Sequence, residues 1–191
     1  MIDLDSARLV AFHDGKGAAP ASALWGAIED NHRCNGLLWK EEDLARRRHV
    51  PDAEIAANKR AIDGYNQRRN DAIERIDEAL LAVFSSAMTN PDTRLNSETP
   101  GSMIDRLSIL SLKIHHMRLQ TERTDVDRTH LETCRAKLER LREQRGDLAA
   151  CLDRLLAEAA RGETRFKVYR QFKMYNDPAL NPAIYGEKKG A

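Results

Sequence analysis

The chain has 191 residues, of which 41% are hydrophobic and 32% are charged. This length suits one domain, or one domain with an appendage, and the high charged fraction is typical of long helices with wet outer faces. Lys and Arg number 31 against 30 Asp and Glu, so the overall charge provides no argument for a nucleic-acid or membrane partner.

The first half of the chain predicts three helices. A short helix is expected over residues 5–13, followed by a loop with two glycines. A long helix is expected over residues 21–48 and ends before Pro51. The third helix begins at Pro51 or Asp52 and runs to about residue 88, where an Asn-Pro-Asp sequence ends it.

The second half predicts two helices and a tail of different character. One helix begins at Pro100 and runs to about residue 123, and the next spans residues 126–161 and stops at Gly162. The tail from residue 163 has two proline turns and, at residues 165–175, the nearest approach to a strand pattern. It contains five of the ten aromatic residues of the chain: Phe166, Tyr169, Phe172, Tyr175 and Tyr185.

We therefore predict an all-α protein, an antiparallel bundle of four long helices plus a short N-terminal helix and an irregular aromatic C-terminal arm. Residues 1–162 would form the bundle, and residues 163–191 would dock on it or on a partner subunit. Three cysteines without a CxxC pair indicate a reducing compartment. Since no signal peptide or long apolar run occurs, we expect a cytoplasmic protein with no membrane partner.

Polar residues interrupt the helix stripes that should face the core. His32, Asn35 and Glu42 lie along the stripe of the second helix, and Asn66 and Arg69 lie in the centre of the third, with Asn70 beside them. In the fourth helix, Asp105 lies on a buried-looking side, and the solvent strip would be Ser108, Ser111, His115 and Arg118. In the fifth helix, Arg145 interrupts a seam of leucines at 3-4 spacing.

Two interpretations follow from the cost of burying charge without a partner. The residues could form internal ion pairs, such as Glu42 with Arg69 or Asp105 with Arg145. Alternatively, they could line a polar pocket between helices, where bundles commonly bind ligands. The number of interrupted stripes favours the pocket.

Three chemistries can be compared with this pattern. Glu29 and His32 have the Glu-x-x-His spacing of di-iron bundles, but a second such motif is missing. A magnesium–phosphate site like that of the helical nucleotide pyrophosphohydrolases would use carboxylates such as Glu29 and Asp43 to hold the metal. Arg or Lys side chains would bind the phosphate. The regular pattern of acidic residues that is typical of those enzymes is absent from this sequence. Nucleophile elbows, P-loops and dinucleotide motifs do not occur in the sequence.

The tail alternates basic residues with aromatic ones, at Arg165, Lys167, Arg170 and Lys173. Such a pattern can bind single-stranded nucleic acid. Because the patch is short and the chain is near neutral, we favour an arm whose aromatic side chains dock on the bundle or on a neighbouring subunit.

Five runs of sequence are distinctive as strings. They are LWGAIEDNHR at residues 24–33, LWKEED at 38–43, NQRRNDAIE at 66–74, ETPGSMIDRLSIL at 98–110 and YRQFKMYNDP at 169–178. Together they resemble the bacterial family called domain of unknown function 4254, over nearly the whole chain. That resemblance implies no defined activity. Because members of the family are often encoded near glycosyltransferases for cell-surface polysaccharides, it implies a sugar-phosphate or nucleotide-sugar context.

The favoured hypothesis is an interhelix pocket for a small phosphorylated ligand, with magnesium as a conceivable cofactor; the sequence leaves open whether the ligand is also processed. The free amides that open the fourth helix would attract an anion, unless this is an ordinary proline-led helix start. The candidate catalytic residues are His32 as general acid or base, Glu42 and Asp105. The candidate ligand-binding residues are Asn35, Asn66, Arg69, Asn70, Gly101, Ser102, Arg106 and Lys113, and the candidate metal ligands are Glu29 and Asp43.

The rival hypothesis is a non-catalytic adaptor. The leucine seam of the last long helix and the aromatic arm would then join two copies of the chain in a homodimer.

Overall fold

The computed structural model describes residues 3–171, 174 and 177–186. The all-helical prediction is confirmed, and each long helix ends within four residues of its expected bounds. The helices are α1 (Ser6–His13), α2 (Ala23–Leu44), α3 (Asp52–Phe84), α4 (Pro100–Thr121), α5 (Arg128–Ala160) and the short α6 (Pro182–Tyr185). Two two-residue strands, β1 (Arg94–Leu95) and β2 (Thr164–Arg165), complete the described elements.

The long helices begin where the sequence supplies hydrogen-bond acceptors or acids for their free backbone amides. Helix α3 follows Pro51 and carries Asp52 and Glu54 in its first turn, where the helix dipole favours negative charge. The other three long helices are capped by side chains: Ser22 accepts from the amide of Trp25, Thr99 from that of Ser102 and Asp127 from that of His130.

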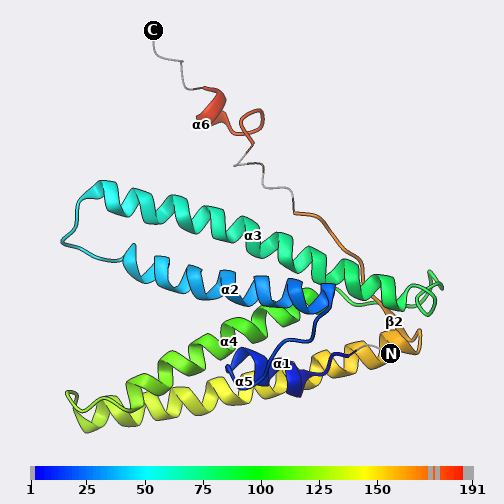
Figure 1. Cartoon of the computed structure of the whole chain (residues 1–191), viewed down its shortest axis with the longest axis horizontal. Helices are drawn as coiled ribbons and strands as arrows, with labels where there is room; N and C mark the ends of the chain where they lie inside the picture. Colours follow the sequence, from blue (N-terminus) through cyan, green and yellow to red (C-terminus); the bar gives the residue numbers. More distant parts are fainter. Residues whose placement is uncertain (1–2, 172–173, 175–176, 187–191) are drawn as a thin grey trace.

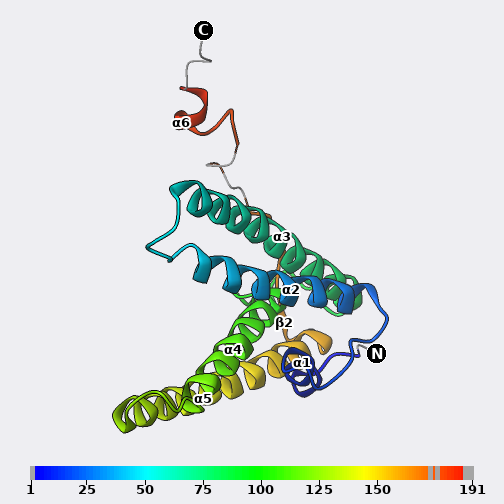
Figure 2. The same cartoon turned by 60° about the vertical axis from the view of Figure 1, so that its left-hand side comes forward.

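The four long helices form two hairpins. Helix α2 packs chiefly on α3, and α4 packs chiefly on α5, with fewer contacts between the pairs. The two hairpins meet at one end and diverge toward the loops at residues 45–51 and 122–127, as both views show (Figures 1 and 2). The single antiparallel bundle of four helices is therefore not confirmed, because the four helices share a core only at the end where the hairpins meet.

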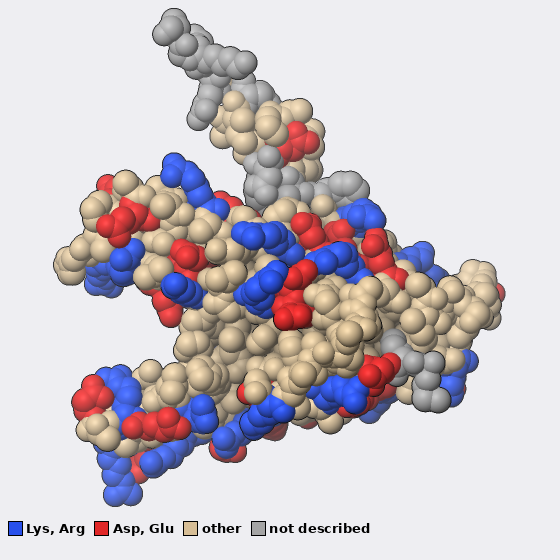
Figure 3. Space-filling view, in the orientation of Figure 1, with Lys and Arg blue, Asp and Glu red and all other residues tan. Residues whose placement is uncertain are grey.

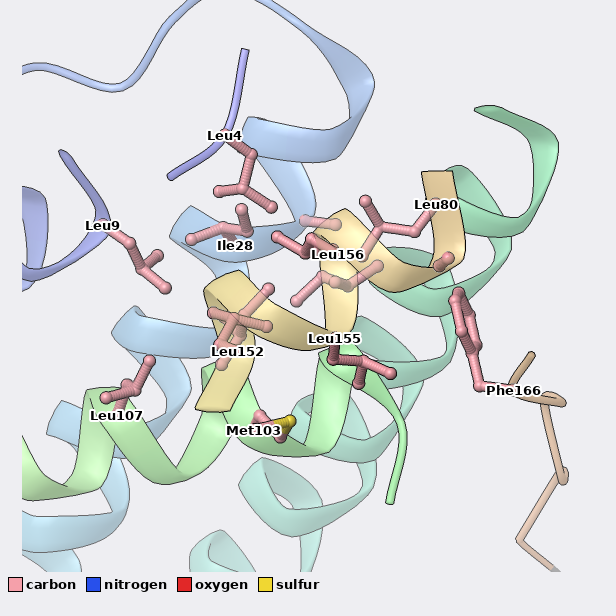
Figure 4. Close-up of a cluster of buried hydrophobic side chains, with 14 of the residues drawn as sticks. Leu4, Leu9, Ile28, Leu80, Met103, Leu107, Leu152, Leu155, Leu156 and Phe166 are labelled. Atoms are coloured by element: carbon pink, nitrogen blue, oxygen red, sulfur yellow. The ribbon is translucent and has the colours of Figure 1, made fainter. Parts of the chain in front are cut away.

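That common end contains the hydrophobic core (Figure 4). Leu152 of α5 is fully buried there, together with Ile28 of α2 and Leu107 of α4. Burying a side chain of this size stabilises the fold by about 2 kcal/mol. Helix α1 contributes Leu9, and the N-terminal segment contributes Leu4, so the first residues of the chain join the same cluster as the long helices.

Strands β1 and β2 pair in parallel, Arg94 with Thr164 and Leu95 with Arg165. Phe166, next along the chain, is buried in the core, so the first residues of the tail pack against the helices. The expected strand pattern at residues 165–175 becomes a strand only at β2 among the described residues.

Beyond β2 the chain follows α3. Arg170 forms ion pairs with Glu74 and Glu78, and the backbone amide of Gln171 donates to Glu74. Helix α6 then stands away from the hairpins (Figure 1). Phe172, Lys173 and Tyr175, which belong to the expected aromatic arm, lie outside the described residues. In the described part of the chain, no helix is both long enough and apolar enough to cross a membrane.

Helices α3 and α4 approach each other closely at Gly101. A Cβ atom there would lie 2.6 Å from the carbonyl oxygen of Ile73 and 2.8 Å from the carboxyl carbon of Asp77. Only glycine allows this approach without a shift of backbone.

Gly101→Ala is expected to destabilise the protein by about 2 kcal/mol, because the added methyl group overpacks the α3–α4 contact. Gly146→Ala is the matched control, since nothing lies within 4 Å of its would-be Cβ atom, and a mid-helix alanine should stabilise α5 by about 0.5–1 kcal/mol. Urea unfolding of both variants measures these changes. Equal stability of the two variants would contradict the close approach at Gly101.

Candidate functional site

The polar residues that interrupt the helix stripes gather at the border of the core. Along α2, Trp25 and Ile28 lie in the core, Asn31 and Asn35 follow one and two turns later, and Trp39 lies farther out. Along α4, buried polar residues at 105, 108 and 111 alternate with core residues at 103, 104 and 107. A polar layer therefore separates the shared core from the diverging halves of the hairpins.

The centre of this layer is the carboxylate of Asp105, which is buried. Its Oδ1 atom accepts hydrogen bonds from Nδ2 of Asn31 at 2.8 Å and from Nδ2 of Asn35 at 2.9 Å. Asn35 also donates to the hydroxyl oxygen of Ser108 at 3.0 Å. We call these four residues the Asp105 network. Since it joins α2 to α4, it connects one hairpin to the other.

Arg69 of α3 lies beside this network but is not satisfied by it. Its Nε atom is 3.9 Å from Oδ1 of Asp105, which is too far for a hydrogen bond. The Nε atom is buried and lacks a hydrogen-bond partner among the described residues. Asp105 is thus near enough to attract the charge of Arg69, but the Nε donor of Arg69 makes no hydrogen bond with the described residues.

The Arg69 cavity, of about 310 Å³, opens on the outer side of this layer. Its polar residues come from α2 and α3, and its apolar residues come from α2 and α4. They are Asn35, Glu42, Asp43, Arg46, Asn66 and Arg69, with Leu38, Trp39, Ile109 and Leu112. The sequence-predicted residues Asn35, Glu42, Asn66 and Arg69 thus line one cavity, together with Asp43.

A second cavity, the Lys113 cavity, of about 620 Å³, shares Trp39 and Asp43 with the first. It adds Lys113 and His116 from α4 and Lys137 and Arg140 from α5. We call the two cavities together the interhairpin cleft. The space-filling view shows the molecule hollowed between the two hairpins (Figure 3).

An aromatic pair spans the interhairpin cleft. The rings of Trp39 on α2 and His116 on α4 are stacked, with centroids 4.3 Å apart and planes 3° from parallel. Each ring covers one face of the other, so the outer faces of the pair are the surface that could stack on a sugar or a base.

His32 does not lie in this cleft. Its Nδ1 atom is 2.8 Å from the hydroxyl oxygen of Ser108, and its ring stacks on His13 with centroids 4.7 Å apart. It lines a different cavity, on the side of α1. Burial lowers the pKa of His32, and Asp14 opposes that shift. The expectation that His32 shares a pocket with Arg69 is therefore corrected: they lie on opposite sides of the Asp105 network.

The ion pairs in the structure differ from those expected. Glu42 pairs with Arg46 one turn away at 2.7 Å, not with Arg69. Arg145 pairs with Asp14 at 2.6 Å and donates to Ser111, so it is not the ion-pair partner of Asp105. Ser108 and Ser111 are buried, whereas the periodicity of α4 placed them in its solvent strip.

The amides that were expected to form an anion site at the start of α4 already have partners within the chain. The amide of Gly101 donates to Oδ1 of Asp77 at 2.6 Å, and the amide of Ser102 donates to Thr99. A carboxylate of the chain itself therefore occupies the position where a phosphate would sit. Arg106, one turn on, is exposed and pairs with Glu98.

Two more predicted residues lie apart from the cleft. Asn70 donates to the side chain of Gln171 in the tail, and Glu29 is exposed on α2 without lining either cavity of the cleft. Asp43 does line the cleft, so the proposed metal ligands Glu29 and Asp43 are not brought together. Within the described ranges, no group of three or more His, Cys, Asp or Glu side chains comes close enough to hold a metal ion.

One protein family matches the chain. The family described as "Protein of unknown function (DUF4254)" matches residues 25–168. The chain belongs to this family. The DUF4254 match includes the Asp105 network and every residue lining the interhairpin cleft, while His13 precedes it. Searches of curated proteins and of solved structures found no match.

Sequence reasoning missed four residues near the site: Asn31, Ser108, His13 and Asp14. Asn31 lies four residues before Asn35, so the helical period could have placed both amides on one face. For Asp14, 131 positions from its partner Arg145, no local signal exists.

Replacing Asp105 tests whether its network connects the hairpins. Asp105→Ala should destabilise the protein by about 3 kcal/mol, because the amides of Asn31 and Asn35 lose their acceptor in a buried place. Asp105→Asn keeps an oxygen that can accept both bonds and should cost less. Thermal and urea unfolding measure the stability of both variants. An Asp105→Ala variant as stable as wild type would argue against a role of the network in connecting the hairpins.

Asp77 predicts a pH dependence of stability. Burial raises its pKa from 3.8 to about 6, against the opposing hydrogen bonds from Thr99 and Gly101. Because the folded state holds this proton more tightly than the unfolded state, the contribution of Asp77 to stability falls as pH rises from about 4 to 6. Asp77→Asn should therefore gain on the order of 3 kcal/mol relative to wild type between pH 4 and 7.

The comparison with Asp77→Asn is needed because His13 acts in the opposite direction. Burial lowers the pKa of His13 to about 3, so its contribution to stability is lost as pH falls below the unfolded value of 6.5. Asp71→Asn, an exposed substitution on α3, serves as the control. A stability difference between wild type and Asp77→Asn that stays constant with pH would contradict the raised pKa.

Proposed function

We propose that the protein binds a small phosphorylated ligand, a sugar phosphate or nucleotide sugar, in the interhairpin cleft. The observation that carries the proposal is Arg69, which lines the cleft, lies 3.9 Å from its one ion-pair partner Asp105 among the described residues and makes no hydrogen bond with them. A partly buried cation without hydrogen bonds is costly. Its planar donors match the oxygens of a phosphate group in a two-point contact.

The other lining residues support a ligand larger than phosphate alone. The amide of Asn66 beside Arg69 offers a donor and an acceptor for hydroxyl groups. The stacked Trp39 and His116 supply a flat surface near the middle of the cleft. At the α5 side, Lys137 and Arg140 add positive charge that suits a second phosphate.

The proposal concerns binding, in a cell-surface polysaccharide context that the family resemblance implies. Glu42 and Asp43 are the carboxylates that line the Arg69 cavity, so they are the side chains that could hold a magnesium ion carried in with a phosphate. Asp105 supports the cleft floor through its network and does not need to touch the ligand.

Ligand-induced stabilisation tests the proposal. Wild-type protein is screened against sugar phosphates and nucleotide sugars, with and without magnesium, and hits are measured by calorimetry. We expect a ligand that raises the melting temperature of wild type and binds Arg69→Met at least about ten-fold more weakly, because one charged phosphate contact is lost. Arg75→Met, an exposed α3 arginine that pairs with Asp30 outside the cleft, should bind like wild type.

Two results together would overturn the proposal: no stabilisation of wild type by any tested ligand, and an Arg69→Met variant more stable than wild type. The second result would show that Arg69 is merely a strained part of the fold. Equal loss of binding in Arg75→Met would also count against a specific phosphate contact.

A second candidate function rests on a different observation, the exposed apolar side chains of the tail. Leu180 is 50% exposed and Ile184, in α6, is 41% exposed; α6 stands away from the hairpins (Figure 1). Apolar side chains of this kind favour contact with another surface. The corresponding proposal is an adaptor whose tail docks on a second copy of the chain.

Solution mass distinguishes this adaptor function from a monomeric binding protein. Leu180→Asp/Ile184→Asp should convert a wild-type dimer to monomer, because charge at an apolar contact opposes docking. Val83→Asp, an exposed apolar site on α3, is the control. A monomeric wild type, or an unchanged mass in the double variant, would remove the adaptor function.

A further inference from the structure

A third cavity, of about 700 Å³, lies on the other side of the Asp105 network from the Arg69 cavity. The end of α1 and the loop after it form one wall, and α2, α4 and α5 form the others. We call it the His13 cavity. Its polar lining includes His13, His32 and Ser111.

The charge of this cavity is strongly positive. Lys16, Arg118, Arg142 and Arg145 all line it, and among the described lining residues Asp14 is the single carboxylate. Asp14 is already paired with Arg145 at 2.6 Å. Cationic charge gathered in a concave site of low dielectric attracts anions more strongly than the same charge on a flat surface.

One polar side chain of this cavity, that of His13, lacks a hydrogen-bond partner among the described residues. Its side chain is only 6% exposed, and neither ring nitrogen has a hydrogen-bond partner among the described residues. The ring is held in place by stacking on His32. Leaving two buried polar nitrogens unpaired is unfavourable, so a group that supplies hydrogen-bonding atoms to His13 would be bound favourably.

We propose that the His13 cavity is a second binding site, distinct from the interhairpin cleft, that takes a phosphate group, either as inorganic phosphate or as a phosphate monoester. Phosphate oxygens would accept from the ring of His13 and from the guanidinium groups at the rim. The imidazole of His13 is neutral without the ligand, because burial, His32 and Arg145 lower its pKa to about 3. A neutral ring still carries one N–H donor.

Two arginines at the rim are free to turn toward such an anion. Arg142 pairs with Glu139 at 2.6 Å, and Arg118 lies 3.9 Å from Glu122, both in exposed surface pairs on their own helices. Exposed pairs of this kind are weak and exchange readily. Arg145, in contrast, is held by Asp14 and Ser111 and keeps its charge fixed inside the cavity.

Calorimetry at about physiological ionic strength tests the site, with inorganic phosphate and glycerol phosphate as separate probes. The test variant is Arg118→Gln/Arg142→Gln, which removes two rim charges without touching the buried residues. The control is Arg128→Gln/Arg135→Gln, which removes the same charge from exposed positions on α5 outside the cavity. Arg69→Met reports on the interhairpin cleft.

We expect one equivalent of phosphate or glycerol phosphate to bind wild type, the control and Arg69→Met alike. Binding to Arg118→Gln/Arg142→Gln should be at least about ten-fold weaker. In NMR spectra of wild type, the ring signals of His13 and His32 should shift with the probe. If only glycerol phosphate binds, the site is specific for monoesters. If both bind equally, the phosphate group alone is recognised.

The proposal is overturned if neither probe binds wild type, or if the test and control variants bind equally. It is also overturned if Arg69→Met alone abolishes binding and the signal of His13 does not move, because the probe would then occupy the interhairpin cleft. The His13 proposal thus fails or succeeds independently of the proposed function of the cleft.

Discussion

One buried carboxylate connects the two halves of this protein. Oδ1 of Asp105 on α4 accepts the amides of Asn31 and Asn35 on α2, and these residues are 74 and 70 positions away in the sequence. Hydrophobic burial at the common end holds the hairpins together but is not directional. The hydrogen bonds to Asp105 are directional, so they define how α2 lies against α4 and where the hairpins begin to diverge.

The cavities follow from that arrangement. On one side of the Asp105 network the hairpins separate, and the Arg69 cavity opens with carboxylates and cations in its lining. On the other side, the end of α1 forms one wall of the His13 cavity, and most of the charged residues that line this cavity are cationic. Ser108 contacts both sides, since it accepts from Asn35 and shares a hydrogen bond with His32. The two sites therefore differ in chemistry although one polar layer separates them.

The sequence predicts the helices and part of the site. A polar side chain in an apolar helix stripe must find a partner, and in the structure Asn35 is hydrogen-bonded to Asp105, with Arg69 3.9 Å from the same carboxylate. Periodicity reports the face of a helix, but not the angle at which two hairpins cross. That angle places His32 and Arg69 in different cavities and buries Ser108. The anion site expected at the start of α4 has a different explanation. The amide of Gly101 donates to Asp77, which lies 24 positions earlier in the sequence, so the residues around Gly101 do not reveal this partner.

The divergence of the hairpins has a mechanical consequence. Beyond the polar layer, the outer half of each helix packs mainly on its own hairpin partner, so a small rotation of one hairpin against the other would change the width of the opening and leave the shared core intact. Such small rigid-body movements about a packed base are the usual form of hinge closure. A ligand that contacts Arg69 on one hairpin and Lys137 on the other would hold the two hairpins closer together. The protein would then be more compact in solution with the ligand bound than without it.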